Sequence, residues 1–228
     1  MASCRLAADE VHVWCMRISD GLQKLPLYKQ LLSADELLRA GKYFQQKDQQ
    51  RFVVSRGVQR MVLGRYADMA PDKLKFILGE NKKPKIADSS TEELFYNLSH
   101  AGDRILLAVA NSPVGVDVEY LDPDFDFKDI LPDNFSAQEI GWINETNSME
   151  RFYQLWTRKE GFLKATGKGL SDQLSVTPAL NGSHNLPREL LKGDEAWIQQ
   201  SFKTDNDHIA AVACEGKWRL KAYQFNLI

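Results

Sequence analysis

The chain has 228 residues, of which 43% are hydrophobic, so it can form one large domain or two small lobes. Its formal net charge of −2 argues against general nucleic-acid binding. The charge is uneven: residues 1–112 hold 17 Lys and Arg against 13 Asp and Glu, whereas residues 113–228 hold 12 against 18. This split suits a first half that binds a polyanion and a second half that binds a metal cation.

The cysteines Cys4, Cys15 and Cys214 are odd in number and lack the spacing of a metal site, which argues against zinc and is typical of free thiols in a reducing cytosol. Residues 1–10 carry charges where a signal peptide would be apolar. The uncharged and largely apolar run at residues 105–116 is too short to span a bilayer. We therefore expect a cytoplasmic protein that does not bind membranes.

The first half is expected to mix strands and helices. Ser33, with Glu36 three residues later, forms a capping box that predicts the start of a helix. Apolar residues at helical spacing predict an amphipathic helix with a basic flank over residues 47–66. The predicted strands are residues 11–18, 73–78 and 105–110, and the predicted turns are residues 81–84 and 100–103.

The second half has a similar proportion of helices and strands, which suggests a duplicated architecture with lobes at 1–112 and 113–228. A long helix is predicted over residues 149–166, where Gly167 is a natural C-cap. An acidic loop, residues 122–129, leads to short helices over 136–144. The predicted strands are residues 114–120, 174–176, 209–213 and 218–225.

Two acidic clusters about 40 residues apart are the most informative feature of the sequence. Asp117 and Glu119 project from the same face of a strand because they are two residues apart. The long helix can bring Glu160 towards them. Three converging carboxylates repel one another unless a cation lies between them, and Mg²⁺ is the hard cation that prefers oxygen ligands and leaves positions open for phosphate. Phosphoryl chemistry is therefore the first hypothesis.

Each acidic cluster also has a simpler interpretation. Glu160 and Lys164 could form an exposed i, i+4 ion pair worth a few tenths of a kcal/mol. The alternation of Asp117 and Glu119 with valines also describes the polar face of an edge strand. The coincidence of the two clusters favours a metal site.

Two further segments are open to two interpretations. His100 follows residues 96–99, where Ser and Asn favour turns, so it is either a surface histidine or an anion contact in a loop. Lys82, Lys83 and Lys85 surround Pro84, and such a run is either a solvated loop or an anion-binding one.

In this order, these segments resemble the surfactin-synthetase-activating type of 4′-phosphopantetheinyl transferase. The match extends from about residue 35 to about residue 175. The most specific segment has a tryptophan, a Lys-Glu pair, a lysine four residues later and then Gly-x-Gly-Leu. The segments are Lys83-Pro84, Asn97-Leu98-Ser99-His100, Gly115-Val116-Asp117-Val118-Glu119, and Trp156 to Lys164 followed by Gly167-Lys168-Gly169-Leu170.

The resemblance implies an α/β (α+β) fold in which two similar lobes form a pseudo-dimer, with coenzyme A and Mg²⁺ in the cleft between them. It implies transfer of phosphopantetheine from coenzyme A to a serine of an apo acyl, peptidyl or aryl carrier protein. Relatives of the short branch are about half as long and trimerise, so the present length implies a monomer.

The resemblance also assigns roles to individual residues. The implied Mg²⁺ ligands are Asp117, Glu119 and Glu160, and the implied catalytic residues are Glu160, as the base, and Lys164, on the pyrophosphate. The implied coenzyme A contacts are Lys83, Ser99, His100 and Lys164, with Arg51 and Arg39 as weaker assignments.

The sequence departs from the family pattern at three positions. Lys82 replaces a glycine, Ala101 replaces a common serine, and Gly161 replaces a small alanine. None of these changes removes a charged group from the implied chemistry. Two alternatives stay open at this point: a non-catalytic module that binds coenzyme A or a carrier domain, and a Mg²⁺-dependent nucleotide pyrophosphohydrolase.

Overall fold

The computed structural model describes residues 4–79, 83–87, 94–167, 174–180, 183–184 and 196–226. Lys82 and the Lys168-Gly169-Leu170 segment lie outside these ranges. Within the described ranges, no helix is long and apolar enough to cross a membrane.

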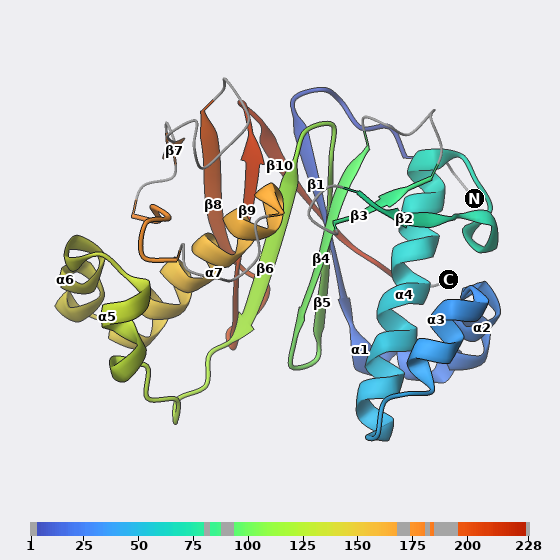
Figure 1. Cartoon of the computed structure of the whole chain (residues 1–228), viewed down its shortest axis with the longest axis horizontal. Coiled ribbons are helices and arrows are strands. Elements are labelled where there is room, and N and C mark those ends of the chain that lie inside the picture. The colour runs from blue at the N-terminus through green and yellow to red at the C-terminus, as the bar shows by residue number, and fades with distance from the viewer. Residues whose placement is uncertain are drawn as a thin grey trace.

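Two four-stranded sheets meet in the middle of the molecule, and a long helix lies on the outer side of each one (Figure 1). The first sheet has the order β10-β1-β5-β4, and the second has the order β6-β9-β8-β7. The strands of the first sheet are β1 (Glu10–Arg17), β4 (Phe95–Ala101), β5 (Arg104–Ala110) and β10 (Arg219–Gln224). Those of the second are β6 (Val114–Tyr120), β7 (Ser183–His184), β8 (Trp197–Lys203) and β9 (His208–Glu215).

The two long predicted helices are present as α4 (Gln46–Ala67) and α7 (Ser148–Thr166). Unlike the amphipathic helix expected, α4 is buried on nearly all sides between Phe52 and Gly64. Gly167 ends α7 in the left-handed conformation, with φ = 72°, as expected of a C-cap glycine. The shorter helices are α1 (Ile18–Gly21), α2 (Leu25–Leu31), α3 (Ala34–Ala40), α5 (Leu131–Asn134) and α6 (Ala137–Glu145), with 3₁₀ turns η1 (Leu22–Lys24), η2 (Pro71–Lys73) and η5 (Lys128–Ile130). The predicted capping box of Ser33 and Glu36 is present at the start of α3.

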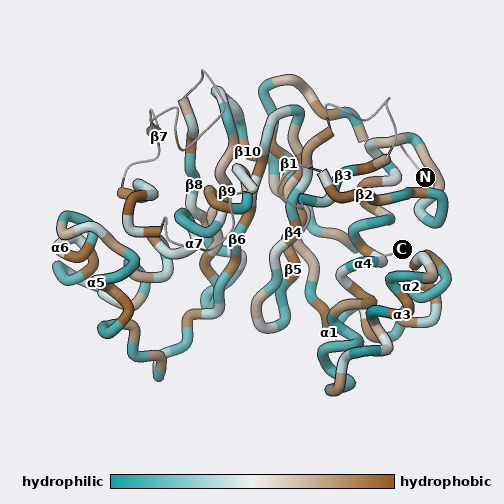
Figure 2. Tube along the Cα trace, viewed as in Figure 1, coloured by the Kyte–Doolittle hydropathy of each residue, from teal (hydrophilic) through white to brown (hydrophobic). Residues whose placement is uncertain are grey.

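The interface between the two sheets is apolar because β1, β5, β6 and β9 each direct alternate small or β-branched side chains into it. Figure 2 shows hydrophobic residues recurring along these central strands, whereas the peripheral turns are largely hydrophilic. The buried residues of this interface are Val11, Val13, Cys15, Leu106, Ala108, Ala110, Val114, Val116, Val118, Ala210, Val212 and Cys214. This core holds the two halves of the chain face to face.

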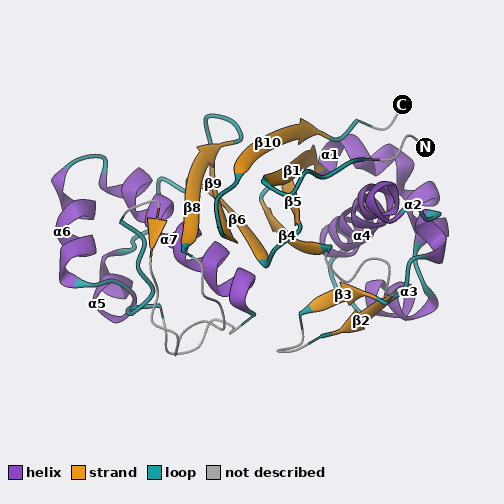
Figure 3. Cartoon of the chain, turned by 90° about the horizontal axis from the view of Figure 1, so that it is seen from above, coloured by secondary structure: helices purple, strands orange, loops and turns teal. Residues whose placement is uncertain are grey.

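The α/β prediction is confirmed, and so is the arrangement as two lobes that each combine a sheet with a long helix. The last strand, however, returns to the first sheet: β10 pairs in parallel with β1. The view from above shows β10 crossing from the second lobe to lie beside β1 (Figure 3). The proposed boundary between residues 112 and 113 stays a prediction.

Three predictions of local structure are wrong. Residues 100–103 do not form the whole turn, because β4 extends through Ala101 and pairs with β5 from Phe95 to Ala101. Residues 174–176 form a turn instead of a strand: the Leu174 carbonyl accepts hydrogen bonds from the Thr177 N–H and from the Lys159 ammonium. The strand predicted over 73–78 is limited to β2 (Phe76–Leu78), which forms a separate hairpin with β3 (Pro84–Ile86).

Candidate active site

A close approach between α7 and β6 positions the candidate site. A Cβ atom at Gly115 would lie 2.0 Å from the Gly161 carbonyl oxygen and 2.4 Å from the Ala165 nitrogen, so only glycine allows the helix backbone to rest on the strand here. This contact brings the part of α7 that carries Glu160 and Lys164 over the centre of β6, where Asp117 lies.

Asp117 is the centre of the site, and side chains from three elements meet at it. Its carboxylate is buried, and Oδ1 accepts hydrogen bonds from Lys164 Nζ at 2.5 Å and from Ser99 Oγ at 2.9 Å. Lys164 Nζ also donates to Ser99 Oγ at 3.0 Å. The structure therefore brings β4, β6 and α7 together through three of the predicted site residues.

Two carboxylate oxygens in this site lack a hydrogen-bond partner although they are buried: Oδ2 of Asp117 and Oε1 of Glu160. Such atoms are costly in a folded protein unless a donor or a cation binds them. Protein sites for Mg²⁺ commonly supply one or two carboxylates and leave the other positions to water and substrate phosphate. These two oxygens therefore fit a magnesium ion.

A complete cage of three carboxylates is not assembled. In the part of the chain that the structure describes, no group of three or more His, Cys, Asp or Glu side chains is arranged to hold a metal ion. Lys164 instead occupies one oxygen of Asp117. The assignment of Asp117, Glu119 and Glu160 as a joint metal site stays a prediction.

The three carboxylates nevertheless affect one another electrostatically. Burial, followed by the charge of Asp117, raises the pKa of Glu160 to about 7, while Lys164 opposes the shift. Burial and the charges of Asp117 and Glu160 raise the pKa of Glu119 to about 7 as well, against Lys164 and a hydrogen bond from Trp156. In the metal-free protein, both carboxyl groups therefore titrate near neutral pH.

Basic side chains border the site on the first lobe. Burial, followed by the positive charge of Arg51, lowers the pKa of His100. Arg51 also pairs with Asp48 at 2.9 Å. The Arg39 guanidinium lies 5.4 Å from the centre of the Phe52 ring. The contacts of Arg39, Arg51 and His100 with a ligand stay predictions.

Lys83 has partners that the sequence did not predict. Its ammonium donates to the carbonyl oxygens of Val114 and Ala165, at 2.9 Å each. Burial lowers its pKa to about 8. Lys83 therefore ties the start of β6 to the end of α7, and only its remaining N–H is available for the predicted phosphate contact.

The sequence interpretation gave no role to Lys159, the neighbour of Glu160. Lys159 is fully buried, pairs with Glu139 at 2.9 Å, and donates to the carbonyls of Leu174 and Thr177 at 2.7 and 2.6 Å. The adjacent Arg158 donates to two more carbonyls of the same segment, residues 174–180. Within this pair, Lys159 therefore anchors the segment 174–180, and Glu160 contributes a carboxylate to the site.

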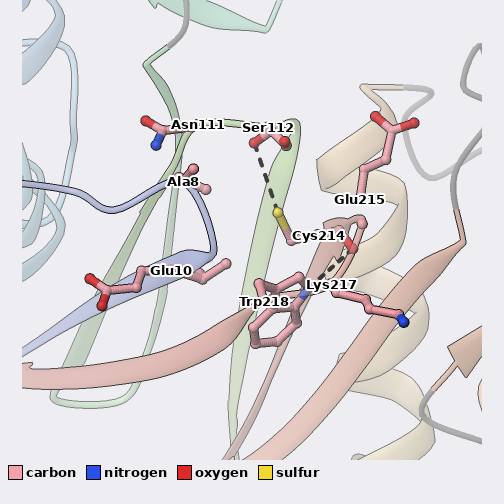
Figure 4. A pocket seen from close by; sticks show the side chains of 11 residues that line it. Ala8, Glu10, Asn111, Ser112, Cys214, Glu215, Lys217 and Trp218 are labelled. Atoms are coloured by element: carbon pink, nitrogen blue, oxygen red, sulfur yellow. Dashed lines mark hydrogen bonds between the residues drawn. The ribbon is translucent and has the colours of Figure 1, made fainter.

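A small cavity of about 110 Å³ lies elsewhere, where β1, the turn before β6 and the turn between β9 and β10 meet (Figure 4). Its lining includes Glu10, Ser112, Cys214 and Trp218. None of the predicted site residues lines it. Cys214 is buried there, and its burial raises the pKa of its thiol to about 12, so the thiol is unreactive at neutral pH.

Known proteins share both halves of this architecture. Residues 22–112 match the family described as 4′-phosphopantetheinyl transferase, N-terminal, and residues 113–213 match the 4′-phosphopantetheinyl transferase superfamily. The chain is 31% identical over 226 residues to the 4′-phosphopantetheinyl transferase HetI of Nostoc sp., covering 96% of this chain and 94% of HetI.

More distant relatives have the same named activity. The 4′-phosphopantetheinyl transferase Sfp of Bacillus subtilis is 26% identical over 191 residues, which cover 81% of this chain and 83% of Sfp. The L-aminoadipate-semialdehyde dehydrogenase-phosphopantetheinyl transferase of Xenopus laevis is 26% identical over 222 residues, which cover 88% of this chain and 72% of that protein. The chain is therefore an enzyme that belongs to the 4′-phosphopantetheinyl transferase superfamily.

Proposed function

We propose that this enzyme transfers 4′-phosphopantetheine from coenzyme A to a serine of an apo acyl, peptidyl or aryl carrier protein, with Mg²⁺ as cofactor. The observation that carries the proposal is the pairing of Lys164 with Asp117 beside the partnerless carboxylate oxygen of Glu160. A carboxylate oxygen that can bind a cation, next to a lysine that can bind phosphate, suits a pyrophosphate substrate.

The reaction exchanges one P–O bond for another. The serine oxygen attacks the β-phosphorus of coenzyme A, the bond from this phosphorus to the bridging oxygen breaks, and adenosine 3′,5′-bisphosphate leaves with the bonding electrons. Mg²⁺ held by Asp117 and Glu160 would supply positive charge that stabilises the phosphates of the leaving group. Glu119 is proposed as its third ligand.

The other steps, proton transfer, charge stabilisation and substrate binding, are proposed for side chains of the chain itself. Glu160 is proposed to accept the serine proton directly or through a water molecule. Lys164 stabilises the charge that develops on the phosphates. His100, Ser99, Arg51, Lys83 and Arg39 are proposed to hold the phosphates of coenzyme A.

The finer classification rests on the organisation of the chain. We propose that the enzyme is of the two-lobed, surfactin-synthetase-activating type, a proposal that two adjacent family matches in one chain support. Its three cysteines are free, which supports a reducing compartment such as the cytoplasm. No contact with nucleic acid or membrane is proposed.

The test is intact mass spectrometry of a panel of apo carrier proteins incubated with the enzyme, coenzyme A and Mg²⁺. We expect a gain of one phosphopantetheine group on the carrier. Cleavage of coenzyme A without this gain would identify a pyrophosphohydrolase. Binding of coenzyme A or carrier without either product would identify a non-catalytic module.

A further inference from the structure

The two sheets face each other at the site through β4 and β6, the edge strands of the first and second sheets. No backbone ladder joins these two described strands. Backbone groups along the facing edge of β6 therefore need partners other than a neighbouring strand, because unpaired polar groups at a buried edge are costly.

Side chains supply these partners. Oδ1 of Asn97, on β4, accepts a hydrogen bond from the Val116 N–H at 2.9 Å. Two residues earlier on the same edge of β6, the Val114 carbonyl accepts a hydrogen bond from Lys83 at 2.9 Å. Alternate residues of a strand direct their backbone groups to the same side, so Val114 and Val116 both face the same edge of β6. The two hydrogen bonds therefore satisfy backbone groups along this edge.

The Asn97 bond lies next to the centre of the site. Val116 directly precedes Asp117, and Ser99, two residues after Asn97, donates to Oδ1 of Asp117 at 2.9 Å. Asn97 therefore fixes the backbone beside Asp117 from the same strand from which Ser99 binds its carboxylate. The amide suits this position because it offers an acceptor without adding a negative charge near Asp117.

We propose that Asn97 is a positioning residue for the transfer reaction, which fixes Asp117 by holding the N–H of Val116. This inference rests on the proposed function. It predicts that loss of the acceptor lowers kcat and leaves the KM for coenzyme A unchanged, because Asn97 needs no contact with the substrate to act in this way.

The first measurement is hydrogen exchange at the Val116 amide, which does not depend on activity. In Asn97→Ala the exchange of this amide should become about tenfold faster, because it loses the acceptor that Asn97 supplies. Asn97→Asp keeps an acceptor oxygen and should keep the protection; because it also adds a negative charge near Asp117, only its exchange and not its kcat is compared. Unchanged exchange in Asn97→Ala, or lost protection in Asn97→Asp, would overturn the proposal.

The second measurement is the kinetics of transfer. We expect Asn97→Ala to lower kcat by about ten- to a hundredfold, the effect of misplacing a reacting group by a fraction of an ångström to one ångström. The matched control is Asn134→Ala, which also removes an asparagine side-chain bond to the backbone, to Ile130, but far from the site in sequence and on α5. It should leave kcat unchanged.

Two kinetic results would contradict the proposal. A raised KM with an unchanged kcat would make Asn97 a substrate contact, and an unchanged kcat with faster Val116 exchange would show that the bond does not position Asp117. If Asn97→Ala does not fold, the exchange measurement on Asn97→Asp decides. If the wild-type enzyme modifies no carrier, the proposed function fails while the exchange result still reports on the bond.

Discussion

Lys164 on α7 and Asp117 on β6 form an ion pair of 2.5 Å, and Ser99 on β4 hydrogen-bonds to both residues. The site thus joins the two lobes through one buried carboxylate. Of the two side chains, Lys164 is the more exposed and Asp117 is buried.

The first prediction concerns Lys164→Met. It should lower kcat for transfer by about a hundredfold, the typical cost of removing one donor to a developing oxyanion, and it should lower the unfolding temperature because Asp117 loses its cation. The control is Lys203→Met, which breaks an exposed pair with Glu150 at 2.9 Å and should change neither quantity appreciably. Equal kinetics for both variants would remove Lys164 from the mechanism.

The second prediction concerns the pH dependence of stability. The pKa of Glu160 is about 7 in the folded protein against 4.5 for an ordinary glutamate, so the folded state holds a proton that the unfolded state releases. Stability from this group therefore falls as the pH rises from about 4.5 to about 7. Urea unfolding of metal-free protein at pH 5 and pH 8 should show that Glu160→Gln gains stability over wild type at pH 8 but not at pH 5.

The same variant tests catalysis. Glu160→Gln should lower kcat by about 10²- to 10⁴-fold, the usual contribution of a general base, although it is at least as stable as wild type at pH 8. Activity close to wild type would show that Glu160 neither accepts the proton nor contributes to the site.

The third prediction uses two glycines as a matched pair. Gly115→Ala should destabilise the protein by at least about 1–3 kcal/mol and reduce transfer, because its Cβ would overlap the α7 backbone at 2.0 Å. A Cβ at Gly161 would lie 3.3 Å from the Ala211 carbonyl, so Gly161→Ala should fold and remain active. Thermal unfolding and carrier modification measure both; a harmless Gly115→Ala would contradict the close contact.

The fourth prediction separates two residues proposed to contact coenzyme A. His100→Ala should raise the KM for coenzyme A by about tenfold at an unchanged kcat and unfolding temperature, because its proposed partner is a phosphate present in ground and transition states alike. Lys83→Ala should also lower the unfolding temperature, because two carbonyls lose their donor. Dephospho-coenzyme A is the comparison substrate: if His100→Ala is impaired to the same degree with both donors, His100 does not contact the 3′-phosphate.

The sequence was sufficient to predict the long helices and the strand that carries Asp117, because periodicity and capping are local signals. It could not predict that β10 joins the first sheet, because a strand pattern does not identify the partner strand. The turn-favouring residues 96–99 lie in β4 because pairing with β5 satisfies their backbone, while the Asn97 and Ser99 side chains bond across to β6.

The residue types of the site were predictable, but their partners were not. Asp117, Glu160 and Lys164 are identified by spacing and by resemblance, whereas the contacts of Lys83 with Val114 and Ala165 depend on how three distant segments pack. The anchoring role of Lys159 was equally hidden, since a lysine in a helical motif is expected at the surface and is buried here only because Glu139 and two carbonyls surround it.

The last prediction concerns oligomeric state. Ser99 of the first lobe and Asp117 and Lys164 of the second meet within one chain, and β10 closes the first sheet from the same chain. A site built in this way needs no second copy, so we expect a monomer in sedimentation. Initial rates should stay proportional to enzyme concentration down to the nanomolar range, because a monomer has no subunit interface that dilution could break. Rates that fall with the square of the concentration, or a trimer that loses activity when it dissociates, would show that the site is shared between chains.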